Sequence, residues 1–156
     1  MKLAVGSDHA GFRLKVDLVK KLSKEFKVID FGTFSEESCD YPDYAVKVVN
    51  AVLNKEADCG ILICATGEGM AIVANKFKGI RAGVCYSDDV AKLLSEHNFV
   101  NVICFPSRIR LNNNEEITAD LLYRWTKIWI ESKNSVEERH KRRIKKIIAI
   151  EEANFK

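Results

Sequence analysis

Residues 61–70 read ILICATGEGM, and the fold of the chain is decided here. A run of apolar residues that starts at Ile61 stops at Cys64, and a loop of small residues with two glycines follows. After the loop, residues 71–76 favour a helix. This order is typical of a buried parallel strand that brings a side chain to the edge of a sheet. The backbone N–H groups at the start of the helix would favour an anion beside the thiol.

Short β-type runs alternate with helical patterns along the rest of the chain. We expect strands at residues 3–6, 28–31, 61–64, 80–85 and 102–105. Between them, apolar residues recur every three or four positions, as they do in amphipathic helices. This repeated alternation predicts an α/β fold in which helices cover both faces of a five-stranded parallel sheet.

The highly charged segment 135–156 extends the chain beyond the last of these elements. Ser135 and Glu138 have the spacing of a capping box, which predicts the start of a helix. The basic block 139–146 reads RHKRRIKK and has three interpretations: a nucleic-acid patch, a phosphate grip or a solvated helix face. The helix has only a short isoleucine stripe, starting at Ile144, so we expect a partner subunit to cover it.

The composition indicates a soluble globular protein in a reducing compartment. The 156 residues suffice for a single domain over 1–156; 47% of them are hydrophobic, 30% are charged, and the formal net charge is +3. No apolar run is long enough for a membrane span, and residues 1–8 do not resemble a signal peptide. The five cysteines form no CxxC pair and no cluster with zinc-type spacing. We therefore expect a cytoplasmic protein without a metal site.

Candidate ligand-binding groups follow the predicted strands, because ligands of such folds bind at the carboxyl ends of the strands. Cys64 is a candidate base or nucleophile, and the N–H groups of residues 66–70 are candidate donors to an oxyanion. Glu68 is a rival base, or simply a residue favoured at a helix start. Asp8 and His9 are candidate groups for a polar ligand, although Asp8 can equally cap the following helix.

Further candidates lie at helix ends and in the basic segment. Tyr41 stands at a predicted helix start, where a ligand role and a purely structural role are both open. His97 ends the fourth helix, so it should lie opposite the ligand edge unless another chain brings it to a site. Arg139, His140 and Arg143 share one helix face and suit a phosphate. A thiol, an amide-rich loop, an imidazole and such cations together favour proton transfer on a small phosphorylated metabolite.

Short motifs run in order over nearly the whole chain: GSDHAG (6–11), VIDFGT (28–33), DYPDYA (40–45), GILIC (60–64), ANK (74–76), GIRA (79–82), EHN (96–98), SR (107–108) and RHKRR (139–143). Together they resemble the family of ribose-5-phosphate isomerase B, which also includes galactose-6-phosphate isomerase. The resemblance is specific because so many separate motifs agree in order and position.

The resemblance implies a Rossmann-like three-layer α/β/α sandwich that forms a homodimer or a dimer of dimers, with each active site shared between two subunits. The C-terminal helical extension would pack on the partner subunit. The implied activity is that of an aldose–ketose isomerase without a cofactor. It would interconvert D-ribose 5-phosphate and D-ribulose 5-phosphate through an enediolate, in the pentose phosphate pathway. Its ligand would be a small sugar phosphate, and neither nucleic acid nor membrane would be a partner.

The resemblance also implies a role for each candidate residue. Cys64 would be the base that moves a proton between C2 and C1, His97 would promote opening of the furanose ring, and Thr66 would belong to the enediolate-binding loop. The substrate-binding residues would be Asp8, His9, Tyr41, Gly67, Glu68, Gly69, Met70, Asn98, Arg108, Arg139 and Arg143. In this set, His9 and the three arginines would hold the phosphate, and Asp8, Tyr41 and Asn98 would bind sugar hydroxyls.

The chain departs from the family pattern in its loops. Ala65 stands where a glycine is usual, and it strains the loop if its φ is positive. Ala71 replaces a usual serine, and Pro106 replaces a small residue. Met70 occupies the position of the glutamate base of another branch, which places this chain in the cysteine branch.

Three other functions are open at this point. The chain can be an isomerase of a six-carbon sugar phosphate, such as allose 6-phosphate or galactose 6-phosphate. It can also bind sugar phosphates without turnover. The third alternative is a nucleic-acid-binding module that uses residues 139–146, although this block lacks aromatic residues between its cations.

Overall fold

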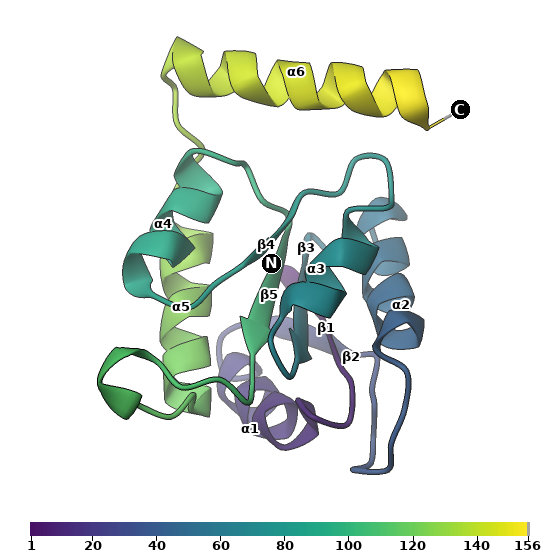
Figure 1. Cartoon of the computed structure of the whole chain (residues 1–156), viewed down its shortest axis with the longest axis vertical. Coiled ribbons are helices and arrows are strands. Elements are labelled where there is room, and N and C mark those ends of the chain that lie inside the picture. The colour runs from purple at the N-terminus through teal and green to yellow at the C-terminus, as the bar shows by residue number, and fades with distance from the viewer. Residues whose placement is uncertain (156) are drawn as a thin grey trace.

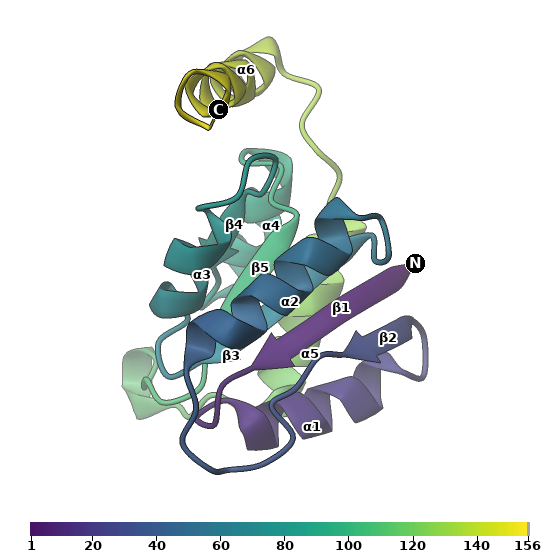
Figure 2. The ribbon, with the colours of Figure 1, turned by 90° about the vertical axis from the view of Figure 1, so that its right-hand side faces the viewer.

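The computed structural model describes residues 1–155, which form five strands and six α-helices (Figures 1 and 2). A short 3₁₀ turn at Asn112–Asn114 follows the last strand. In chain order the elements are β1 (Lys2–Ser7), α1 (Phe12–Leu22), β2 (Lys27–Asp30), α2 (Tyr41–Leu53), β3 (Cys59–Cys64), α3 (Glu68–Ala74), β4 (Ala82–Val84), α4 (Asp88–Glu96), β5 (Val102–Pro106), α5 (Ala119–Glu131) and α6 (Glu138–Asn154).

The five strands form one sheet in the order β2-β1-β3-β5-β4, and every neighbouring pair is parallel. The predicted five-stranded parallel sheet is confirmed. β3 is the central strand: Ile63 pairs with Ser7 of β1, and Cys64 pairs with Pro106 of β5. The loops that follow β1, β3 and β5 therefore meet at one edge of the sheet.

Helices cover both faces of the sheet, as predicted. One core lies between the sheet and α1, α4 and α5, and the other lies between the sheet and α2 and α3 (Figure 2). Side chains of β3 alternate between them, so Ile61 and Ile63 belong to the first core, whereas Leu62 and Cys64 belong to the second. The three-layer Rossmann-like α/β/α sandwich is thus confirmed, and Cys64 is on the face that α2 and α3 cover.

Helix α6 is set apart from the sandwich and crosses the end at which the strands begin (Figures 1 and 2). Few contacts hold it there. The imidazole of His140 stacks on that of His97 at the end of α4. The carboxylate of Glu151 accepts a hydrogen bond from the N–H of Gly79 at 3.2 Å, and Ile144 is 6% exposed.

The predicted capping box at the start of this helix is wrong. α6 begins at Glu138, and its N-cap residue Glu137 makes no side-chain cap bond. The N–H of Ser135 donates to the carbonyl of Glu96 at 2.8 Å, and its hydroxyl accepts from the N–H of Glu137 at 3.1 Å. The serine therefore fastens the linker to the end of α4 instead of capping α6.

A buried ion pair ties α1 to the end of β2. The side chain of Lys15 is fully buried, and its ammonium lies 2.5 Å from both carboxylate oxygens of Asp30. The ring centroid of Phe34 is 4.9 Å from the same nitrogen. Asp30 also accepts from the N–H of Gly32 at 2.9 Å. The pair thus holds the start of the loop that leads to α2.

Asp30→Asn should lower the free energy of unfolding by about 3 kcal/mol, because it leaves the buried ammonium of Lys15 without its counter-charge. The Asp30 side chain is 26% exposed, so the loss should lie at the lower end of the range for broken buried pairs. Denaturant unfolding measures it. Asp17→Asn is the control, because the exposed Asp17–Lys20 pair at 3.7 Å should contribute less than about 1 kcal/mol. Equal losses would contradict the prediction.

Candidate active site

Cys64 ends β3 and is 4% exposed, so the central strand presents a thiol at the carboxyl edge of the sheet. The N–H of Gly67 donates to its Sγ at 3.2 Å. Gly67 has a φ of +81°, and a Cβ there would lie 3.2 Å from the backbone of Phe105. Only glycine meets both conditions without strain, and this allows the loop to turn back on the thiol before α3 begins.

Ala65 does not strain this loop. The non-glycine residues with positive φ lie elsewhere in the chain, so the condition for strain is not met. Its carbonyl accepts from the N–H groups of Ser107 at 3.1 Å and Arg108 at 2.9 Å. Loop residues after β3 and β5 are therefore joined by main-chain hydrogen bonds, and the exposed Arg108 stands beside the loop that follows Cys64.

Main-chain donors gather where α3 begins. The first backbone bond of the helix runs from the N–H of Ala71 to the carbonyl of Gly67 at 3.1 Å. The N–H of Glu68 donates to the hydroxyl of Thr66 at 3.2 Å. The N–H groups of Gly69 and Met70 belong to the first turn, whose donors lack acceptors within the helix. The Met70 side chain itself is fully buried, so this residue offers only its main chain.

Tyr41 begins α2, and its ring lies against the first turn of α3. A Cβ at Gly69 would lie 3.0 Å from atoms of the Tyr41 ring, so the ring touches the glycine backbone directly. Pro42 occupies the first turn of α2, as predicted. Tyr41 is 38% exposed. The helix start therefore brings a phenol to the same edge as Cys64.

Asp8 follows β1 and is 6% exposed. Its N–H donates to the carbonyl of Ile63 at 3.2 Å, which joins its loop to the end of β3. Its Oδ1 accepts from the N–H of Gly11 at 3.1 Å. Gly11 is the N-cap residue of α1, so Asp8 shapes the loop ahead of the helix and is not its cap.

His9 is half-buried, and one of its ring nitrogens is held by the loop after β2. The N–H of Cys39 donates to Nδ1 at 3.2 Å. The neutral imidazole therefore carries its proton on Nε2, which is then a donor. This role of Cys39 could not be predicted from sequence patterns, because the contact joins residues that are 30 positions apart.

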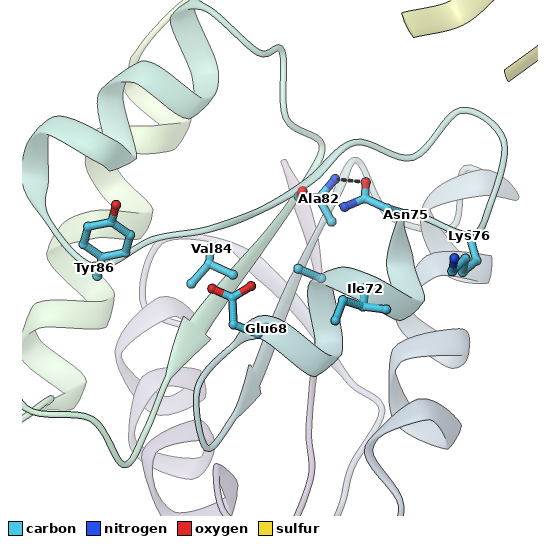
Figure 3. Close-up of a pocket in the computed structure, with 8 residues that line it drawn as sticks. Glu68, Ile72, Asn75, Lys76, Ala82, Val84 and Tyr86 are labelled. Atoms are coloured by element: carbon cyan, nitrogen blue, oxygen red, sulfur yellow. Dashed lines mark hydrogen bonds between the residues drawn. The ribbon is translucent and has the colours of Figure 1, made fainter. Parts of the chain in front are cut away.

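Glu68 points into a pocket that Cys64 does not line (Figure 3). The pocket measures about 540 Å³ and lies between α3 and β4, and Val84 and Tyr86 line it together with Glu68. Its other lining residues are Ala71, Ile72, Asn75, Lys76 and Ala82. The thiol belongs instead to the core under α2 and α3. The two candidate bases therefore have different surroundings.

A second set of candidate residues lies at the opposite end of the sheet. His97 is the C-cap residue of α4, Arg139 and Arg143 are exposed on α6, and these helices meet where the strands begin (Figure 1). Asn98 is exposed and lines a pocket together with residues of α6. Within one chain, this set and Cys64 lie at opposite ends of the sheet, as expected for His97.

The imidazoles of His97 and His140 are stacked, with ring centroids 4.0 Å apart and an angle of 12° between the planes. Helical spacing groups His140 with the arginines, but it does not indicate this contact with α4. Beside the stack, Nε of Arg139 lies 2.7 Å from a carboxylate oxygen of Glu137. The start of α6 therefore carries a dense group of ionisable side chains.

The other buried cysteines behave as core residues. Burial raises the pKa of Cys59 and Cys85 to about 12, and it also raises the pKa of the fully buried Cys104. Among residues 1–155, no group of three His, Cys, Asp or Glu side chains is arranged to hold a metal ion. None of the helices in that range has the length and apolar character of a membrane span.

The model of the ribose/galactose isomerase family matches residues 3–147. The chain belongs to this family. The ribose-5-phosphate isomerase B of Escherichia coli is 43% identical over 152 residues, which cover 97% of this chain and 97% of that protein. The family predicted from the motifs is therefore confirmed.

Solved structures agree with this assignment. The ribose-5-phosphate isomerase B of Clostridium thermocellum has a TM-score of 0.90 and 40% identity, with 98% of this chain and 99% of that chain covered. The ribose-5-phosphate isomerase B of Mycoplasma genitalium with bound ribulose-5-phosphate has a TM-score of 0.85 and 36% identity, over 97% of this chain and 96% of that chain. The likeness thus includes α6 as well as the sandwich.

Gly67→Ala should lower the free energy of unfolding by more than the ~1–2 kcal/mol that a left-handed L-residue costs. The added Cβ would also meet Val84 at 3.1 Å and Phe105 at 3.2 Å. Gly79→Ala is the matched control, because Gly79 has a φ of +86° but its nearest neighbour would be 3.7 Å away. Denaturant unfolding compares the two variants. A smaller loss for Gly67→Ala would rule out crowding at this turn.

Proposed function

We propose that this chain is a ribose-5-phosphate isomerase that interconverts D-ribose 5-phosphate and D-ribulose 5-phosphate. The observation that carries the proposal is the position of Cys64 in a member of this family. Its thiol stands at the end of the central strand, 3.2 Å from the N–H of Gly67. The Mycoplasma genitalium relative supports the choice of substrate, since its structure contains ribulose-5-phosphate.

The reaction moves one proton from C2 of the open-chain aldose to C1. The thiolate of Cys64 takes the proton from C2, and the electron pair of the broken C–H bond forms the enediolate. The same thiol returns the proton to C1, while O2 loses its proton and O1 gains one. One group can serve both steps as base and then as acid. The sugar neither gains nor loses electrons overall, so we propose that no redox cofactor takes part.

Donors at the start of α3 stabilise the charge that develops on the enediolate. We assign this task to the N–H groups of Gly69 and Met70 and to the hydroxyl of Thr66. Fixed donors aimed at developing charge are among the strongest contributions to catalysis. Gly67 and Glu68 shape the loop, because their N–H groups donate to Sγ of Cys64 and to the Thr66 hydroxyl.

Four cationic or donor side chains hold the phosphate. His9 contributes its Nε2–H and Arg108 its guanidinium from the edge that carries Cys64. Arg139 and Arg143 would come from α6 of a second copy. Charge-assisted hydrogen bonds suit a dianionic phosphate. Because the grip is remote from the reacting carbons, its binding energy orients C1 and C2 against the thiol.

The remaining residues handle the sugar ring. His97 promotes ring opening: the hydroxyl at C1 loses its proton, the ring oxygen gains one, and the bond between C1 and the ring oxygen breaks. Asp8, Tyr41 and Asn98 bind the sugar hydroxyls. Asp8 is suited to this because its carboxylate, held by the N–H of Gly11, is fixed at the end of the strand beside β3.

The two sets of residues meet if two copies of the chain form a homodimer. Within one chain, α6 and the end of β3 lie at opposite ends of the sheet (Figure 1). α6 also leaves Ile147 and Ile148 38% exposed and Ile150 62% exposed. We propose that residues 135–156 pack on the second copy, which covers this stripe and receives Arg139 and Arg143. A dimer of dimers would repeat the same contact.

The cytoplasm is the compartment that we propose for this activity. All five cysteines are free, which supports a reducing environment. A pentose phosphate is favoured over a six-carbon sugar phosphate because the named relatives are ribose-5-phosphate isomerases. We propose a sugar phosphate as the ligand of the basic segment in place of nucleic acid.

Cys64→Ala tests the assigned base. Purified wild-type protein should isomerise ribose 5-phosphate without an added metal or nicotinamide. The variant should lose about 10²–10⁴-fold in kcat, as expected for a general base, with little change in KM. Cys59→Ala is the control, since Cys59 is buried in the other core. If Cys64→Ala keeps full activity, the thiol is not the base and Glu68 becomes the candidate.

Mixed dimers test the shared site. Cys64→Ala and Arg143→Ala each disable both sites of a pure dimer. Mixing the two variants after reversible dissociation should restore about a quarter of wild-type activity, because half of the dimers are mixed and each of these has one intact site. Activity is measured against the unmixed variants. No recovery, with mixed dimers shown to form, would place both residues in the site of one chain.

A further inference from the structure

The contact between α4 and α6 contains His140, a residue that has no assigned role in the proposed reaction. His140 lies in the first turn of α6 and stacks on His97, with ring centroids 4.0 Å apart and 12° between the planes. Such a parallel arrangement allows no hydrogen bond between the two rings. It does fix the plane of each ring against the other.

His140 is placed by this stack and not by hydrogen bonds of its Nε2. The residue is 2% exposed, and Nε2 has no hydrogen-bond partner among the described residues. The carboxylate of Glu137 lies 4.0 Å from this nitrogen, beyond hydrogen-bonding distance, and binds Arg139 at 2.7 Å instead. An unpaired buried polar atom is destabilising, so stability alone does not favour an imidazole here.

We propose that His140 is a positioning residue that orients the imidazole of His97 for ring opening. The proposal rests on the proposed function, since it takes His97 to act on the furanose ring. A general acid or base must have its nitrogen within hydrogen-bond reach of the proton that it moves. Without the stack, the side chain at the end of α4 would be free to change rotamer. The same contact joins His97 to the helix that carries Arg139 and Arg143.

The surrounding charges make the stack sensitive to acid. Burial lowers the pKa of His140, and His97, Arg139 and Arg143 lower it further, while Glu137 raises it. The neutral ring is therefore the form that stacks. Its stabilising contribution is present above pH 6.5, the ordinary value for histidine, and is lost as the pH falls through the lowered pKa. Phenylalanine at this position would stack without this loss.

Two substitutions and two assays separate orientation from other roles. His140→Asn removes the ring and keeps a polar side chain, whereas His140→Phe keeps the ring and removes the ionisable nitrogens. Turnover of ribose 5-phosphate requires ring opening. Exchange of the C1 proton of ribulose 5-phosphate with deuterium from the solvent does not, because this ketose has its C5 oxygen blocked by phosphate and is an open chain. The second assay therefore reports the proton transfer by Cys64, with its enediolate donors and the groups that bind the sugar phosphate, but not ring opening.

His140→Asn should lower kcat/KM for ribose 5-phosphate by about tenfold or more, within the usual contribution of a general acid or base. The C1 exchange rate of this variant should stay within about twofold of wild type. His140→Phe should keep both activities within about twofold at about pH 8 and keep ribose 5-phosphate turnover to lower pH than wild type.

The remaining outcomes would overturn the proposal. Equal losses of His140→Asn in both assays would mean that the stack only supports folding, assembly or phosphate binding. Unchanged turnover of ribose 5-phosphate in that variant would mean that His97 needs no such support. A His140→Phe variant as impaired as His140→Asn would refute a role of the ring. Wild-type protein without isomerase activity would overturn the proposed function together with this role, whereas the other results leave the proposed function intact.

Discussion

The pairing of β3 between β1 and β5 is the constraint on which the candidate site depends. Ile63 accepts a hydrogen bond from the N–H of Asp8, and Cys64 accepts one from the N–H of Ser107. Loops from both neighbouring strands are thereby tied to the last two residues of β3. A side chain at the final position of this strand must lie among them. Because side chains alternate along a strand, Cys64 also faces α2, which brings Tyr41 to the same edge.

The fold could be predicted because its signals are local. A buried strand is recognised from four apolar residues in a row, and alternation with helices sets the direction of every strand. The order of the strands depends on pairing between distant residues, so local signals do not reveal it. In the sheet, β5 lies between β3 and β4, and β4 is the edge strand although it precedes β5 in the chain. Ile80 shows the same limit. The apolar run from residue 80 to 85 predicts that it belongs to β4, but its N–H donates to the carbonyl of Phe77 at 3.1 Å and closes the turn after α3.

In the candidate site, the placement of residues at one end of the sheet or the other could be predicted, whereas their side-chain contacts could not. The positions of Cys64 and His97 at opposite ends follow from where each element starts and stops, which the sequence indicates. Each side chain has several possible hydrogen-bonding or stacking partners, and which one it contacts depends on the three-dimensional fold. The sequence alone does not show which partner is used. Ser135 has the spacing of a helix cap, yet its N–H donates to the carbonyl of Glu96 at the end of α4. Its hydroxyl accepts a hydrogen bond from the N–H of Glu137 in the linker. The contacts of Cys39 with His9 and of His140 with His97 likewise join distant residues.

The distance between the two sets has a consequence for the proposed reaction. The thiol and the enediolate donors belong to one chain, whereas His97, Arg139 and Arg143 would reach them from another. Proton transfer and ring opening are then performed by different subunits on the same molecule of sugar. Dissociation of the dimer would remove ring opening and half of the phosphate grip at once, yet leave Cys64 and its loop unchanged. In the proposed dimer, catalysis would therefore depend on assembly. The placement of α6 fits this proposal, since few contacts hold the helix to its own sandwich and its apolar stripe is exposed.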